Sequence, residues 1–192
     1  MTPSMANSDY WDGDISWVTP KDMKLARISD SIDHLTETAL METSIALIPL
    51  NAVLIVVRGM ILAHSFPSAV TDAPVTINQD MKAIRPQSDV LPEYLPWLLR
   101  GMKPVVLSLT EQSAHGTLAL RTDKFFCEAF PIPPLDEQAE IVKHLEVELP
   151  RIDELIAHAK EEIALLKELR AATIVDAVLG RIDLRSDSAM SA

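Results

Sequence analysis

Residues 131–180 read PIPPLDEQAEIVKHLEVELPRIDELIAHAKEEIALLKELRAATIVDAVLG, and this stretch decides the fold. It begins with Pro-Ile-Pro-Pro, which cannot lie inside a helix, so residues 131–134 are predicted to form a stiff linker. The pattern of residues 135–180 is helical and indicates a coiled-coil-like region. Pro150 is expected to divide this region into two helices, because the residue before a proline avoids helical backbone angles.

The second expected helix, which Gly180 is predicted to end, carries an apolar stripe. Its members recur at alternating spacings of four and three residues: Ile152, Ile156, Ala159, Ile163 and Leu166. The helix would be roughly 45 Å long at about 1.5 Å per residue, and one small domain cannot cover a stripe of that length. A partner is therefore expected, most simply a second copy in a homodimer. The alternative is that the helix packs back on its own domain.

Residues 1–130 alternate short apolar runs with turn residues, which is typical of strands and hairpins. Strands are predicted at residues 47–48, 53–57, 61–62, 75–77 and 81–84. A helix is predicted at residues 93–102, while residues 105–109 fit either a helix or a strand. The expected fold class is α+β, with an irregular mixed sheet domain followed by the long helical region.

The chain has 17 Lys and Arg against 28 Asp and Glu, which gives a formal net charge of −11. This charge excludes a basic protein that coats nucleic acid non-specifically, but it leaves room for a small patch that reads bases. A single cysteine, Cys127, excludes a disulfide framework and a multi-cysteine zinc site. The most apolar window, residues 45–63, is interrupted too often to span a membrane. The chain is expected to be soluble and cytoplasmic.

Four stretches carry a resemblance to a known family: YWDGDISWVTPKDM at residues 10–23, VRGMIL at 57–62 with INQD at 77–80, PIPPLDEQAEIV at 131–142, and LKELRAATIVDAVLGRIDL at 166–184. In this order they resemble the specificity subunits of type I restriction-modification systems. The resemblance covers most of residues 2–184.

The resemblance implies a target-recognition domain at residues 1–130, the linker at 131–134, a conserved helical region at 135–180 and a tail at 181–192. It implies that the domain reads one half of a bipartite target in double-stranded DNA. The helices would dock a methyltransferase (modification) subunit that uses S-adenosylmethionine, together with a restriction subunit in the full complex. A non-catalytic protein with no cofactor of its own is expected.

The sequence also departs from the family pattern. Full-length subunits usually have two recognition domains and two long helical regions, whereas this chain contains one of each and no internal repeat. It begins at Met-Thr-Pro-Ser, where family members usually have an earlier helix and strand. It therefore resembles a half subunit, with a recognition domain expected to be truncated at its N-terminus. Two copies would then pair through the apolar stripe and read a palindromic bipartite target.

Reading a DNA sequence requires side chains that can hydrogen-bond to base edges, supported by cations that contact phosphates. The candidates for DNA contact are Lys21, Lys24, Arg58, Asn78, Gln79, Ser113, His115 and Arg121. Each has a plainer alternative. Asn78 and Gln79 could cap a turn, Lys21 and Lys24 could be ordinary solvated charges, and Arg58 could pair with a carboxylate.

Nothing in the sequence indicates catalysis. The chain contains five glycines and neither a phosphate-binding loop nor a dinucleotide motif. Its histidines lie far apart, and Cys127 beside two phenylalanines is expected to be an inert buried thiol. Two competing hypotheses remain. One is a coiled-coil interaction scaffold that no longer binds DNA, and the other is an accessory enzyme that uses Cys127 as its nucleophile.

Overall fold

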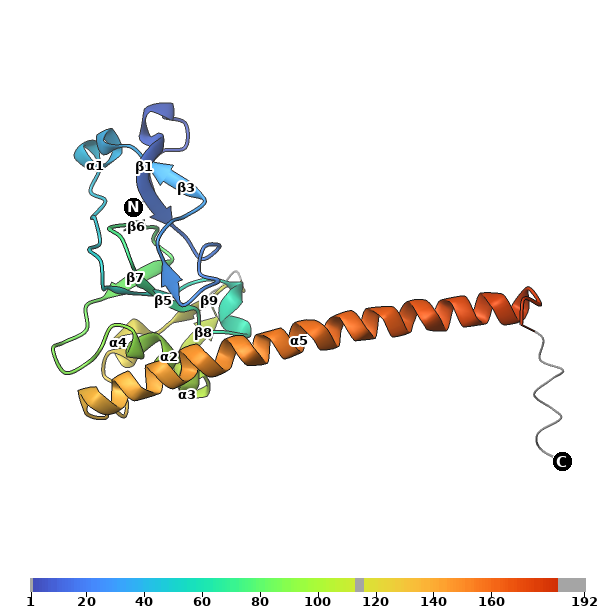
Figure 1. Ribbon diagram of the computed structural model, residues 1–192. Helices are drawn as coiled ribbons and strands as arrows, with labels where there is room; N and C mark the ends of the chain where they lie inside the picture. Colours follow the sequence, from blue (N-terminus) through green and yellow to red (C-terminus); the bar gives the residue numbers. More distant parts are fainter. Residues whose placement is uncertain (1, 113–115, 183–192) are drawn as a thin grey trace. The chain divides into compact units, whose positions relative to one another are not determined.

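The computed structural model describes residues 2–112 and 116–182 (Figure 1). The chain divides into two compact units, Met1–Val142 and Lys143–Ala192. The first unit contains the described strands and the short helices, while the second consists largely of the long helix α5. Among the helices of the described stretches, none combines the length and the apolar character needed to cross a membrane.

The first unit is built on two small sheets and a hairpin (Figure 1). In the three-stranded sheet, β1 (Trp11–Val18) lies between β3 (Asp33–Leu35), which is antiparallel to it, and β6 (Thr76–Ile77), which is parallel. The four-stranded sheet has the order β2 (Arg27–Ile28), β5 (Ser68–Thr71), β4 (Val53–Val56) and β7 (Met81–Ile84). The hairpin pairs β8 (Thr110–Gln112) with β9 (Leu118–Leu120).

Short helices connect these strands. They are η1 (Ser8–Tyr10), α1 (Glu37–Glu42), η2 (Met60–Ala63), α2 (Tyr94–Gly101), α3 (Lys103–Ser108) and α4 (Thr122–Phe125). The last helix, α5, runs from Leu135 to Val178. Mixed sheets followed by a long helix confirm the expected α+β fold class.

The main core forms around β4, in which all four residues are buried. This strand is antiparallel to β5 on one side and to β7 on the other, so it is central to its sheet and has no exposed edge. Leu99 of α2, Val106 of α3 and Phe125 of α4 pack into the same cluster. A smaller cluster around Trp17 and Leu35 supports the three-stranded sheet.

The strands predicted at residues 53–57, 75–77 and 81–84 are confirmed by β4, β6 and β7, and the helix predicted at 93–102 by α2. The ambiguous stretch 105–109 is mostly helical, in α3. The strand predicted at residues 61–62 was wrong, because this stretch forms the 3-10 helix η2. Gly59 precedes η2 with a φ of 142°, a turn that redirects the chain and that residues with a side chain rarely adopt.

The predicted division at Pro150 was also wrong, since α5 continues through this proline. Pro150 lacks the N–H that would bond to the Glu146 carbonyl, but both residues are exposed, so water can satisfy that oxygen. The strong helix formers on both sides of Pro150 then keep this stretch helical despite the missing hydrogen bond. Over its 44 residues α5 is about 66 Å long at about 1.5 Å per residue.

Pro150→Ala is expected to stabilise α5, because alanine restores the missing hydrogen bond and fits a helix interior far better than proline. The helical signal at 222 nm should melt at a higher temperature, consistent with a gain of roughly 2 to 3 kcal/mol. Lys160→Ala is a matched control at another exposed position of the same helix and should change stability by less than about 0.5 kcal/mol. An unchanged melting temperature for Pro150→Ala would show that the missing hydrogen bond at Pro150 does not destabilise the helix.

Candidate nucleic-acid interface

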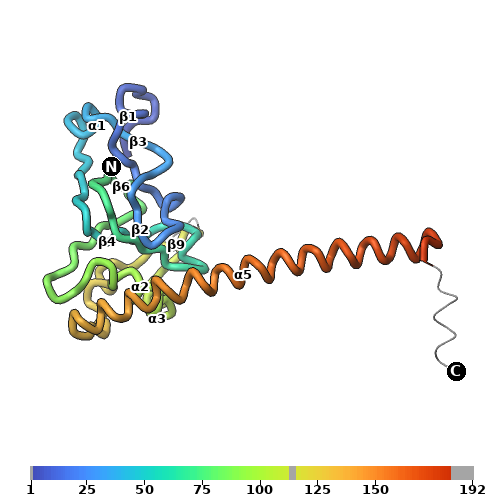
Figure 2. Tube along the Cα trace, in the orientation of Figure 1, coloured from blue at the N-terminus to red at the C-terminus, as the bar shows by residue number. Residues whose placement is uncertain are grey.

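The ends of β1 and β6 lie side by side, as Figure 2 shows. The two strands are parallel, with Val18 opposite Ile77, and the Asn78 N–H donates to the Val18 carbonyl over 3.3 Å. The loop after β1, residues 19–26, therefore begins next to the turn after β6, residues 78–80. These two segments hold four of the predicted DNA-contacting residues.

The chain after β4 joins the same edge. The N–H groups of Val57 and Arg58 both donate to the Asp80 carbonyl, over 2.8 and 3.2 Å. The Gly59 N–H then donates to the Leu118 carbonyl over 2.9 Å, which attaches the β8–β9 hairpin. We call this continuous edge the loop rim. It consists of the described residues 19–26, 58–60, 78–80, 110–112 and 116–121.

The loop after β1 presents Lys21 and Lys24 to solvent. Its shape is fixed by the Asp22 carboxylate, which accepts hydrogen bonds from the N–H and the hydroxyl of Thr19, both at 2.8 Å, and from the Ile32 N–H at 2.9 Å. The two lysines therefore extend from a loop whose backbone is held by the hydrogen bonds to Asp22. Neither pairs with a carboxylate within the described stretches.

In the turn after β6, some of the side-chain hydrogen-bonding groups are already bonded within the protein. Asn78 Oδ1 accepts a hydrogen bond from the Asp80 N–H over 3.1 Å, so this residue does cap the turn. Its amide nitrogen makes no hydrogen bond with a described residue, which leaves a donor for a ligand. Gln79 is exposed, and its side chain bonds to that of Thr2.

Both predicted arginines of the rim are paired with carboxylates. Arg58 lies 3.8 Å from Asp80, and Arg121 lies 3.1 Å from Glu111 and 3.0 Å from Asp123. The hydrogen bond from Arg121 is the largest cause that lowers the pKa of the Asp123 carboxyl. The guanidinium groups are thus held in defined positions. The other two predicted contacts, Ser113 and His115, lie outside the described residues.

No catalytic arrangement is found in the described part of the chain. It contains no group of three or more His, Cys, Asp or Glu side chains that could hold a metal ion. The expectation of a buried thiol was wrong, because Cys127 is exposed in the turn after α4. Its side chain makes no hydrogen bond with a described residue.

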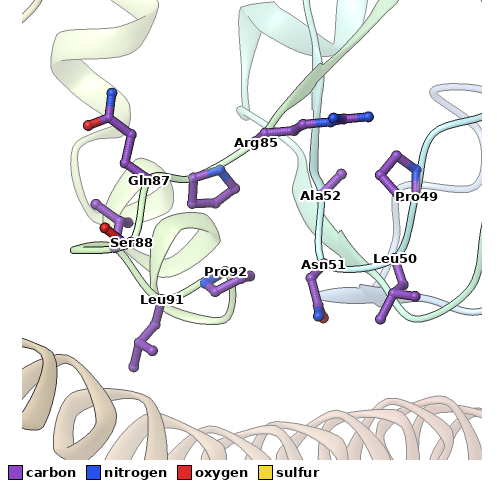
Figure 3. Close-up of a pocket in the computed structure, with 11 residues that line it drawn as sticks. Pro49, Leu50, Asn51, Ala52, Arg85, Gln87, Ser88, Leu91 and Pro92 are labelled. Carbon is purple, nitrogen blue, oxygen red and sulfur yellow. The ribbon is translucent and has the colours of Figure 1, made fainter.

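Figure 3 shows a hollow of about 410 Å³ between the loop before β4 and the segment after β7. Leu50, Leu91 and several prolines give it apolar walls, and Arg85 is the one charged residue in its lining. No carboxylate and no histidine is among its lining residues. It also lies apart from the residues predicted to contact DNA.

In the second unit, the predicted apolar stripe is exposed in the single chain. The relative exposures are 47% for Ile152, 45% for Ile156, 52% for Ile163 and 56% for Leu166. Every residue from 151 to 175 is exposed. An apolar surface of this length is typical of a helix that binds another chain.

The described residues thus form a mixed-sheet domain with a rim of loops, and a long helix follows this domain in the chain. Residues 2–165 match the family model of the type I restriction modification DNA specificity domain, and the chain belongs to this family.

Two curated relatives are specificity subunits of type I restriction enzymes. The chain is 35% identical over 146 residues to the type I restriction enzyme EcoR124I/EcoR124II specificity subunit of Escherichia coli, covering 76% of this chain and 36% of the relative. It is 30% identical over 172 residues to the MjaIX specificity subunit of Methanocaldococcus jannaschii, covering 88% of this chain and 38% of the relative. The chain thus spans little more than a third of the length of these relatives.

Solved structures agree on the fold. One comes from work on complex assembly and conformational transition of the type I R-M system, and matches with a TM-score of 0.68 at 19% identity over 92% of this chain and 41% of the other. The crystal structure of the HsdS subunit from Thermoanaerobacter tengcongensis matches with a TM-score of 0.51 at 19% identity over 88% of this chain and 39% of the other.

Proposed function

We propose that this chain reads one half of a bipartite DNA target for a type I restriction-modification system and performs no chemistry itself. The observation that carries the proposal is the loop rim. Segments distant in sequence, around Lys21, Arg58 and Asn78, are brought to one edge by backbone hydrogen bonds between them. The family match supports DNA as the ligand of this edge.

The chemistry of the rim suits base reading. Asn78 and Gln79 carry amides that can hydrogen-bond to base edges, while Lys21 and Lys24 can contact phosphates or guanine. The arginines differ from the lysines, because carboxylate partners hold the arginine side chains in place and offset their positive charge. We expect Arg58 and Arg121 to fix the geometry of the rim and to contribute less to phosphate attraction.

We also propose that the long helix docks the methyltransferase subunit and pairs with a second copy of this chain. The exposed stripe from Ile152 to Leu166 would form the pairing seam. A two-fold dimer of this kind would present two identical rims and favour a palindromic bipartite target. S-adenosylmethionine would belong to the methyltransferase subunit, and a restriction subunit would join in the full complex.

The test is to co-purify the chain with its methyltransferase subunit, select the target from a random duplex library, and compare affinities for that target and for unrelated duplexes. Gln79→Ala should reduce the preference for the target by about ten- to a hundredfold, the value of one base contact. Gln87→Ala removes another exposed glutamine, outside the rim, and should leave the preference unchanged. A complex that binds every duplex equally would refute the recognition role.

A second candidate, an interaction scaffold that does not bind DNA, is favoured by the carboxylates on the rim. Asp80 and Glu111 on the rim, with Asp123 just beyond it, offset the two arginines, and the chain as a whole carries a net charge of −11. The scaffold predicts a complex that still forms through the helix but retains no DNA in the same titration. Retention of DNA by the complex would exclude it.

A further inference from the structure

A shallow depression of about 230 Å³ lies where the loop after β1 meets the junction of α2 and α3. Three of its lining residues are cations from three separate elements. Lys24 comes from the loop after β1, Arg100 from the last turn of α2, and Lys103 from the start of α3. No carboxylate lines it, although Asp and Glu outnumber Lys and Arg in the whole chain by 28 to 17.

Arg100 is built into this depression. Its Nη2 donates to the Ser68 carbonyl over 2.8 Å and to the Leu25 carbonyl over 3.3 Å, and its guanidinium lies 5.0 Å from the centre of the Trp97 ring. Its Nε and Nη1 make no hydrogen bond with a described residue. Burial removes part of the guanidinium from water and so lowers its pKa.

The two lysines leave the mouth of the depression positively charged. Lys103 Nζ donates to the His64 carbonyl over 3.0 Å, and both Lys24 and Lys103 are exposed. None of the three cations forms an ion pair with a described carboxylate, in contrast to Arg58 and Arg121 on the rim. The positive charge of the depression is therefore not offset by a described carboxylate, whereas the charges of the two rim arginines are.

We propose that this depression binds a backbone phosphate of the DNA duplex and anchors the chain beside the bases that the rim reads. The inference rests on the proposed function and extends it to residues that the sequence did not single out, Arg100 and Lys103. It is continuous with the rim, because Lys24 belongs to the same loop as Lys21. A guanidinium held by two backbone carbonyls and flanked by two exposed ammonium groups suits the charge and the several acceptor oxygens of a phosphate.

The test uses the complex with the methyltransferase subunit and a mixed-sequence duplex, because phosphate attraction does not depend on sequence. The double variant Lys24→Ala with Lys103→Ala should bind about tenfold more weakly at moderate salt. The slope of log affinity against log salt should flatten by about two, since each lysine neutralises about one phosphate. Arg100 is left intact because its bonds to Ser68 and Leu25 support the fold.

The matched control is Lys82→Ala with Arg85→Ala, which removes the same charge from β7 and its end. β7 and β2 are opposite edge strands of the four-stranded sheet, and β2 directly follows the loop that carries Lys24. The control should keep the wild-type slope, and Lys24→Arg with Lys103→Arg should restore it. An unchanged slope in the alanine double variant, or an equal loss in the control, would overturn the phosphate site and leave the recognition role standing. A wild-type complex that binds no duplex would overturn both.

Discussion

The double variant Ile156→Asp with Ile163→Asp is expected to be monomeric in light scattering, whereas the wild-type chain should be a dimer. Both side chains lie on the exposed stripe of α5, seven residues apart, and would be buried in a paired helix. Two substitutions in each of two chains remove four apolar side chains from the seam. At about 1.5 kcal/mol each, the loss is about 6 kcal/mol, or roughly four orders of magnitude in the dimer dissociation constant.

The matched control for this experiment is Ala157→Asp with Ala164→Asp. These positions directly follow the two isoleucines, so the control adds the same charges at the same spacing on a different face of the helix. It should remain dimeric. A monomeric wild-type chain, or loss of the dimer in the control alone, would show that the stripe is not the pairing surface.

Much of the fold could be predicted from local patterns, and the errors have physical causes. β4 was predictable because an unbroken run of branched apolar residues is typical of a central strand. Ile61 and Leu62 look equally strand-like, but they follow the bend at Gly59, whose φ is positive, and form a 3-10 helix. The steric restriction on the residue before a proline predicted a division at Pro150, but the long helical runs on both sides override it.

The site was predictable only in part, because it depends on contacts between distant segments. Lys21, Arg58 and Asn78 could be chosen by residue type, but that they share one edge follows from backbone bonds such as that between Asn78 and Val18. Nothing in the local sequence indicates that Arg121 is paired with two carboxylates. The depression at Arg100 was missed for the same reason, since Lys24 lies far along the chain from Arg100 and Lys103.

A polar clamp at the start of α5 is the remaining feature with a large expected effect. Gln138 is fully buried, and its side-chain oxygen accepts a hydrogen bond from the Leu91 N–H over 2.8 Å. Its side-chain nitrogen donates to the carbonyls of Asp89 and Pro133, both at 2.8 Å. One side chain thus ties the segment before α2 to the linker and to the first turn of the helix. Nearby, Val142 packs into a cluster with residues of α2.

Gln138→Ala is expected to destabilise the first unit by about 4 kcal/mol, measured by urea unfolding of the full chain. The substitution leaves one N–H and two carbonyls of a partly buried site without their Gln138 partner and opens a cavity. Glu137→Ala, at the exposed neighbouring position, should cost less than about 1 kcal/mol. Gln138→Glu keeps the shape but turns a carboxylate oxygen toward two carbonyls, so its loss at pH 7 should be as large as that of alanine. Because the protonated carboxyl can donate one bond, the deficit of this variant relative to wild type should shrink toward pH 5. Equal stability of Gln138→Ala and wild type would mean that apolar packing around Tyr94 and Val142, and not the clamp, holds the helix start in place.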